Sequence, residues 1–169
     1  MKEAQKFYSD WGLRKIKATP NHSIFETKIG SRVELKTPKS KDLPPAATPD
    51  MHFREMVWGV SSKKHLVSIK RELSKDREVV EDKDGTLHCL DPNGIGVGFR
   101  LWRPRTKIDG ARTKINSFDK AERIDEISTF YNDARPIRMG HIGFVLPDLK
   151  AAEHFYRDRL GFWLSDRYA

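Results

Sequence analysis

The sequence of 169 residues has little cysteine and no long hydrophobic run, and each absence excludes a class of protein. One thiol, Cys89, cannot form an intrachain disulfide or a cysteine-based zinc site. No stretch approaches the roughly 18 consecutive apolar residues of a membrane-spanning helix. The first residues include the acidic Glu3 and lack the apolar run of a signal peptide. We therefore expect a protein of the reducing cytoplasm with no membrane partner.

Two common catalytic motifs are also missing, the nucleotide-binding glycine loop and the nucleophile elbow. Gly94, Gly96 and Gly98 lie in a turn and a predicted strand, whereas a dinucleotide fingerprint requires glycines just before a helix. The net charge is +8, from 32 basic and 24 acidic residues. The two signs alternate through every segment, which favours solvated surfaces over a nucleic-acid-binding patch. We expect no nucleic acid as a partner.

The chain contains a repeat near its two ends, in residues 2–13 and 150–162. Lys, Ala, Phe, Tyr and Asp recur in register at the spacing that separates Phe7 from Phe155. After a one-residue insertion, Gly12 corresponds to Gly161. Agreement of this kind indicates a duplicated structural unit.

Each copy predicts a short amphipathic helix. In the first copy Ala4, Phe7, Tyr8 and Trp11 occupy positions i, i+3, i+4 and i+7, which form one apolar stripe. The glycine after each copy supplies the left-handed C-cap that lets the chain turn into a strand. We interpret the aromatic pairs as core residues, without a role in chemistry.

A strand is predicted before the second copy, at residues 139–146, closed by Pro147 and followed by Asp148 as helix N-cap. Alternation puts its large apolar residues under the helix and turns His141 to the opposite face. Nothing comparable precedes the first copy, because Met1 corresponds to the residue after that cap. We expect the first unit to lack its first strand and the chain to be truncated at its N-terminus.

The middle of the chain predicts a hairpin and then one whole module. The hairpin spans residues 23–36 with its turn at Gly30 and Ser31, and a proline-rich loop follows it. The module would contain a strand at 54–60, a helix capped by Ser61 or Ser62, and strands at 77–81, 86–90 and 95–102. This order is strand-helix-strand-strand-strand. We predict an α+β fold of repeated βαβββ modules that form curled mixed sheets with helices outside.

His141 is the candidate metal ligand. In a curled sheet covered by helices, the face opposite the helices lines a concavity, where a neutral imidazole suits iron, manganese or zinc. The alternative is an ordinary, half-buried strand histidine, and the place in the repeat favours the metal. The other histidines lack ligand spacing, and His88 and Cys89, as strand neighbours, point to opposite faces.

These residues resemble a known superfamily. Residues 140–148, 155–162 and 165–167 look like the opening of a vicinal-oxygen-chelate module, and more narrowly like the start of the catalytic C-terminal domain of type I extradiol dioxygenases. Residues 84–100 are similar to the closing strands of their N-terminal domain. We expect a two-module domain at 1–103 and a truncated metal-binding domain at 139–169. The charged stretch 104–138 loses periodicity and is interpreted as the connection between them, with room for a short helix around 119–127.

The resemblance also implies a mechanism. The family holds Fe(II), with Mn(II) as the alternative, through two histidines and a glutamate, and opens the ring of a small aromatic diol with O2. His141 matches the first histidine, and the remaining ligands and acid-base groups are expected beyond Ala169. We expect a homo-oligomer when full length and an inactive isolated chain.

The sequence leaves two questions open. The protein could instead be a glyoxalase-like lyase or isomerase of the same superfamily, or a metal-free protein that binds a small ligand. The segment after residue 138 would lack partner strands and expose its edges. It would then dock on another chain, be disordered, or take the place of the missing first strand.

Overall fold

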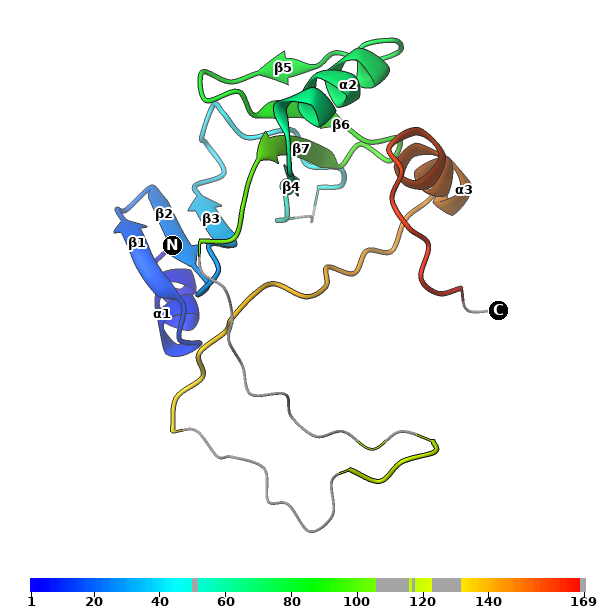
Figure 1. Ribbon diagram of the computed structural model, residues 1–169. Helices are drawn as coiled ribbons and strands as arrows, with labels where there is room; N and C mark the ends of the chain where they lie inside the picture. The colour runs from blue at the N-terminus through cyan, green and yellow to red at the C-terminus, as the bar shows by residue number, and fades with distance from the viewer. Residues whose placement is uncertain (50–51, 106–115, 117, 123–131, 168–169) are drawn as a thin grey trace. The chain divides into compact units, whose positions relative to one another are not determined.

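The computed structural model describes residues 1–49, 52–105, 116, 118–122 and 132–167. The chain divides into two compact units, here called unit 1 (Met1–Ser40 and Pro104–His141) and unit 2 (Lys41–Arg103 and Ile142–Ala169). Each unit contains an open, curled sheet with helical elements (Figure 1). The predicted α+β fold class is confirmed. Among the described helices, none is long and apolar enough to cross a bilayer.

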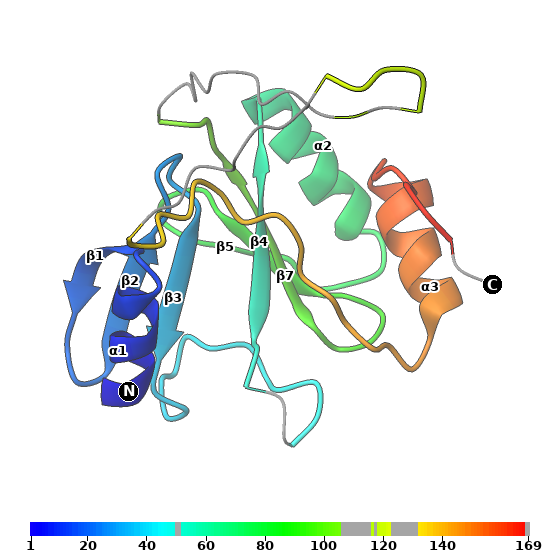
Figure 2. The ribbon, with the colours of Figure 1, turned by 90° about the horizontal axis from the view of Figure 1, so that it is seen from below.

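In its described residues, unit 1 contains one helix followed by an antiparallel three-stranded sheet. Its elements are α1 (Lys2–Asp10), β1 (Arg14–Ala18), β2 (His22–Glu26) and β3 (Arg32–Lys36), with sheet order β1-β2-β3. Helix α1 lies against one face of the sheet, where the ring of Tyr8 is 5.6 Å from that of Phe25 (Figure 2). The predicted helix and hairpin are confirmed. Gly12, with φ of 78°, ends α1 as expected and leads into β1.

Unit 2 contains the complete βαβββ module that the sequence predicts. The elements are β4 (Glu55–Val60), α2 (Lys63–Leu73), β5 (Val80–Glu81), β6 (Leu87–Leu90) and β7 (Gly96–Leu101). The sheet order is β4-β7-β6-β5, with β4 parallel to β7 and the other pairs antiparallel. Ser62 caps α2, because its hydroxyl accepts a hydrogen bond from the His65 amide at 3.2 Å.

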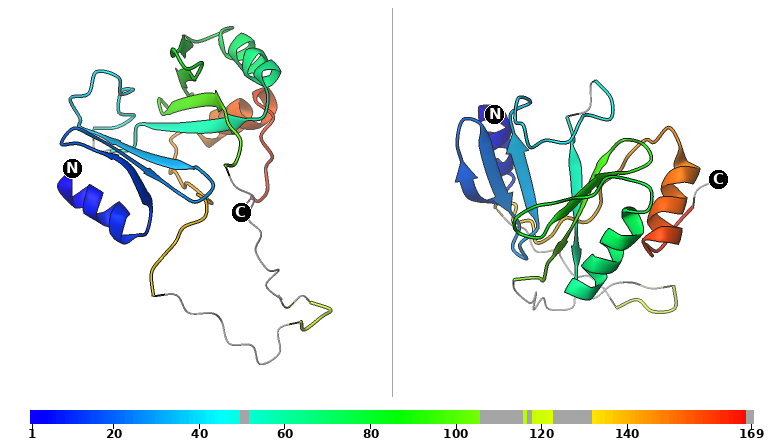
Figure 3. Two further views of the ribbon diagram at one scale, coloured as in Figure 1. Left: turned by 60° about the vertical axis from the view of Figure 1, so that its left-hand side comes forward. Right: turned by 90° about the horizontal axis from the view of Figure 1, so that it is seen from above.

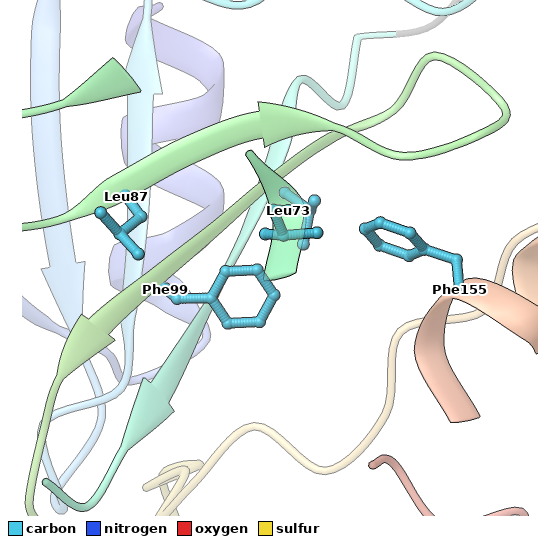
Figure 4. Close-up of a cluster of buried hydrophobic side chains, with 5 residues drawn as sticks. Leu73, Leu87, Phe99 and Phe155 are labelled. Atoms are coloured by element: carbon cyan, nitrogen blue, oxygen red, sulfur yellow. The ribbon is translucent and has the colours of Figure 1, made fainter. Parts of the chain in front are cut away.

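The core of unit 2 lies on one face of this sheet. The alternation of β7 buries Val97 and Phe99 toward α2, and Gly96 and Gly98 occupy the opposite face. The buried cluster consists of Leu73, Leu87, Val97, Phe99 and Phe155, four of which Figure 4 labels. Its members come from α2, from the sheet and from a helix much later in the chain.

That later helix is formed by α3 (Leu149–Glu153) and the π-helical turn η1 (His154–Arg159). Asp148 caps it as predicted, accepting a hydrogen bond from the Ala151 amide at 2.8 Å. Phe155 is 1% exposed within the core of unit 2, so this helix covers the same sheet face as α2 (Figure 3). The helix therefore packs on the module that precedes it in the chain, a placement that the sequence did not suggest.

The strand predicted at residues 139–146 is not formed, and this prediction was wrong. The segment is extended, but no strand among the described residues pairs with it. A strand depends on hydrogen bonds from a neighbour, so apolar alternation alone does not create one. Phe144 instead packs edge-on against Phe53, with ring centroids 5.1 Å apart. Most of the helix expected at 119–127 lies outside the described residues.

Candidate functional site

His141, the predicted metal ligand, is an exposed side chain in the extended segment before α3. Around its neighbours Gly140 and Gly143 an added Cβ would meet nothing within 4 Å. Across the described ranges, His141 forms no hydrogen bond or ion pair, and no three His, Cys, Asp or Glu side chains gather in a metal-binding arrangement. The residues present therefore do not fit a three-ligand iron site. The role of His141 remains a prediction.

The structure reveals a different polar group, which we call the His88 cluster and which consists of His88, Glu55 and Asp82. His88 of β6 has Nδ1 2.7 Å from Glu55 Oε1 of β4 and Nε2 3.2 Å from Asp82 Oδ2. Carboxylate oxygens only accept hydrogen bonds, so the two contacts are satisfied together when both ring nitrogens carry protons. With both nitrogens engaged, this imidazole offers no free ligand atom to a metal.

Gly98 leaves room for the His88 cluster. It pairs with His88 on the intervening strand β7, on the sheet face away from α2. A Cβ at this position would lie 3.2 Å from Glu55 Oε1 and 2.9 Å from the Leu87 carbonyl oxygen. Sequence spacing could not reveal the cluster, since Glu55 and His88 are 33 residues apart. The usable signal was the alternation of β6 and β7, which puts His88 opposite a glycine.

A second charged group, the Glu26 cluster, lies in unit 1 and consists of Glu26, Arg14, Arg32 and Arg105. Glu26 is 1% exposed, and its carboxylate accepts hydrogen bonds from Arg14 Nη2 at 2.5 Å, Arg105 Nη1 at 2.6 Å and Arg32 Nε at 2.9 Å. Burial by itself would raise the pKa of Glu26. The hydrogen bonds from Arg32 and Arg14, with the charge of Arg105, outweigh burial and hold the pKa below its ordinary value. The carboxylate is therefore ionised.

Each unit also contains a cavity. The cavity of unit 2, about 940 Å³, lies on the helix-covered side of the sheet and is lined by Trp58, Phe99 and Phe162, with His65 and Arg71 among its polar residues. The cavity of unit 1, about 330 Å³, is lined by Arg14 and Glu26 together with Lys28 and Arg135. The first has mixed walls, in which aromatic rings alternate with charged and small side chains, and the second has more cations than anions.

Cys89 is unsuited to nucleophilic or metal chemistry. Its side chain points into the helix-covered side of the unit 2 sheet, where it packs against the buried cluster. Burial raises the pKa of the Cys89 thiol to about 11. Because the thiolate is the reactive and metal-binding form, this thiol is inert near neutral pH.

Comparisons with known proteins give a limited result. No family model and no curated protein matches the chain. Among solved structures, a protein from Agrobacterium tumefaciens determined by solution NMR matches at 12% identity, with 60% of this chain and 87% of that chain covered and a TM-score of 0.25. Lactoylglutathione lyase from Agrobacterium tumefaciens matches at 18% identity, with 57% and 81% covered and a TM-score of 0.24.

A third solved structure carries the name of the superfamily that the sequence resembles. This glyoxalase/bleomycin resistance protein/dioxygenase from Alicyclobacillus acidocaldarius matches at 15% identity, with 60% of this chain and 83% of that chain covered and a TM-score of 0.22. The named structural neighbours are thus members of the glyoxalase/bleomycin resistance/dioxygenase group at low identity. With TM-scores of 0.25 or lower, these similarities say nothing about the activity of this chain.

Proposed function

We propose that this chain is part of an iron-dependent extradiol dioxygenase of the vicinal-oxygen-chelate superfamily. In that enzyme this chain would supply the non-catalytic βαβββ modules and the first segment of the metal-binding domain. The observation that carries the proposal is the module of unit 2, in which β4, α2, β5, β6 and β7 follow in order and β4 lies parallel to β7. The motif at residues 140–148, with the helix after it, supports the narrower assignment.

The proposed enzyme needs more than this chain. His141 would be one of three iron ligands, and within the described part of the chain no second ligand lies beside it. Bound iron would supply the activation of the aromatic diol and of O2. One exposed imidazole does not retain Fe(II), because binding by this triad requires all three ligands. We therefore propose that the 169-residue chain alone does not cleave catechols.

The test compares the chain with a longer polypeptide encoded by the flanking sequence. Both are loaded anaerobically with ferrous iron, desalted and assayed for bound iron and for oxygen uptake with catechol. The chain alone should retain no iron, and the longer polypeptide should retain one iron and cleave the ring. In the longer polypeptide His141→Ala should abolish iron retention. His154→Ala, at an exposed histidine paired with Asp158 on η1, is the matched control and should change nothing.

Several outcomes would contradict the proposal. Ring cleavage by the isolated chain would show that the metal site is elsewhere. Iron retention in the longer His141→Ala polypeptide would remove His141 from the site. A longer polypeptide that converts a hemithioacetal without consuming oxygen would be a glyoxalase-like enzyme, and one that binds an aromatic ligand without metal would be a binding protein.

A further inference from the structure

The Glu26 cluster contains more positive charge than its buried carboxylate requires. One guanidinium group would neutralise Glu26, yet three arginines from β1, β3 and the segment after unit 2's last strand converge on it. The four side chains together have a formal charge of +2. Each arginine donates one of its five N–H groups to Glu26, and within the described part of the chain Arg14 has further N–H groups that can bind another acceptor.

The excess charge borders the cavity of unit 1. Arg14 and Glu26 line this cavity of about 330 Å³, and Lys28 and Arg135 add two cations from other segments. The Arg135 side chain has no hydrogen-bond or ion-pair partner in the part of the chain that the structure describes. Glu26 is the only acidic group among the described lining residues.

The backbone fixes Arg135 at the edge of the cavity. The carbonyl oxygen of Pro136 accepts a hydrogen bond from the Lys28 amide at 3.3 Å, and that of Ile137 accepts one from the Ile29 amide at 3.1 Å. On the other side, Gly12 approaches the Ala134 carbonyl so closely that a Cβ there would overlap it. The segment that carries Arg135 is therefore held on both sides rather than resting loosely on the surface.

We propose that this cavity binds a phosphate dianion, either inorganic phosphate or the phosphoryl group of a small monoester. The guanidinium fork matches the spacing of phosphate oxygens and donates two parallel hydrogen bonds to them. A dianion neutralises the formal +2 of the four charged residues that line the cavity, Arg14, Lys28, Arg135 and Glu26, whereas a monoanionic carboxylate leaves it half compensated. Glu26 serves here as a positioning residue, which orients Arg14 without touching the ligand.

Isothermal titration of the full chain with inorganic phosphate tests the proposal, at constant ionic strength and at a pH at which both inorganic phosphate and glycerol phosphate are dianions. Glycerol phosphate, sulfate and acetate are titrated separately under the same conditions. Phosphate and sulfate should bind, and acetate should bind at least about tenfold more weakly, because it has one charge and half the acceptor oxygens. Glycerol phosphate binding more tightly than phosphate would identify a monoester as the ligand.

Two variants distinguish phosphate binding in this cavity from non-specific attraction of an anion to a basic protein. Arg135→Gln removes a cation that has no partner among the described residues, so it should leave the circular dichroism spectrum intact and weaken phosphate binding about tenfold. Lys15→Gln is the matched control. Lys15 follows Arg14 on β1 and faces the opposite side of the sheet, with Phe25 as its register partner, so its loss should change binding less than about twofold.

Three results would overturn the proposal. These are the absence of phosphate binding to the folded chain, acetate binding as tight as phosphate binding, and equal weakening by Arg135→Gln and Lys15→Gln. The last result would show that phosphate responds only to the overall charge. If Arg135→Gln alters the fold, Arg14→Lys replaces it, because this variant keeps the charge and removes the fork. Unchanged phosphate binding in the folded Arg14→Lys chain would equally overturn the proposal.

Discussion

His88 and Glu55 form a 2.7 Å hydrogen-bonded pair across the middle of the unit 2 sheet, although β7 separates their two strands. β7 presents Gly98 between them, and a Cβ at this position would lie 3.2 Å from Glu55 Oε1. The contact ties β6 to β4 on the face away from the helices.

Gly98→Ala is expected to destabilise the chain by about 1–3 kcal/mol, as overpacking does in a close-packed region. The new methyl group would meet the Leu87 carbonyl oxygen at 2.9 Å, which strand pairing holds in place, and Val57 Cγ2 at 3.1 Å. Urea unfolding followed by far-UV circular dichroism measures the change. Gly143→Ala is the control, since no atom lies within 4 Å of its added Cβ, and it should stay within about 0.5 kcal/mol of the parent. Equal effects at both positions would contradict the crowding.

Phe155→Ala tests whether the helix of α3 and η1 belongs to the core of unit 2. Phe155 is 1% exposed and packs with Leu73 and Phe99, so its loss should cost about 3–5 kcal/mol of unfolding free energy. Phe118→Ala provides the same chemical change at a fully exposed ring and should be nearly neutral. A Phe155→Ala chain as stable as the parent would mean that this helix is not docked on the module.

The fold was largely predictable because its signals are local. Alternation in β7, the Ser62 and Asp148 caps and the glycine that ends α1 each act within a few residues, and all are confirmed. The prediction of a strand at 139–146 was wrong because its signal is not local. A strand depends on a partner strand, which the local pattern does not specify. The docking of Phe155 onto Leu73 likewise depends on contacts between residues far apart in sequence.

Gly12→Ala is expected to cost more than Gly161→Ala, although the two glycines are equivalent in the repeat. Both have positive φ, 78° and 74°, and an alanine in the left-handed region costs roughly 1–2 kcal/mol. At Gly161 nothing lies within 4 Å of the added Cβ, whereas at Gly12 the methyl group would overlap the Ala134 carbonyl. Urea midpoints of the two variants give the comparison. Equal losses would show that residues 134–136 do not pack on Gly12.

Arg159→Gln should destabilise the chain at neutral pH and lose this effect in acid. Arg159 hydrogen-bonds Asp76 and Glu72. Hydrogen bonds from Arg159 and Arg77 lower the pKa of Asp76, and those from Lys75 and then Arg159 lower the pKa of Glu72. A lowered folded-state pKa adds stability that is present above the unfolded pKa of about 4 and is lost as pH falls through the folded value.

The measurement is the difference in urea midpoint between the parent and the Arg159→Gln chain as a function of pH. This difference should be constant near neutrality and shrink below about pH 4. Arg71→Gln is the control, because it removes a cation of α2 that has no ion pair among the described residues. Its urea midpoint should differ from that of the parent by the same amount at every pH. A pH-independent effect of Arg159→Gln would assign its contribution to packing against Phe155.

The site was less predictable than the fold, because charge clusters depend on strand register. Glu26, Arg14 and Arg32 meet because β1, β2 and β3 pair with Arg14 and Arg32 both opposite Glu26. Composition alone showed only basic residues scattered along the chain. His141 was singled out by its place in a repeat, and the partners that would test its role are not among the described residues.

Cys89 should react slowly with iodoacetamide in the folded chain. Burial raises its pKa to about 11, so at pH 8 its thiolate is about a hundredfold rarer than that of an unfolded cysteine, and alkylation should slow by at least that factor. Mass spectrometry of alkylation with and without urea measures the ratio. In the Cys89→Ser background, Leu90→Cys moves the thiol to an exposed neighbour on the opposite sheet face, where it should react almost as fast as in urea. If the parent reacts equally fast in both conditions, β6 does not bury Cys89 against the core.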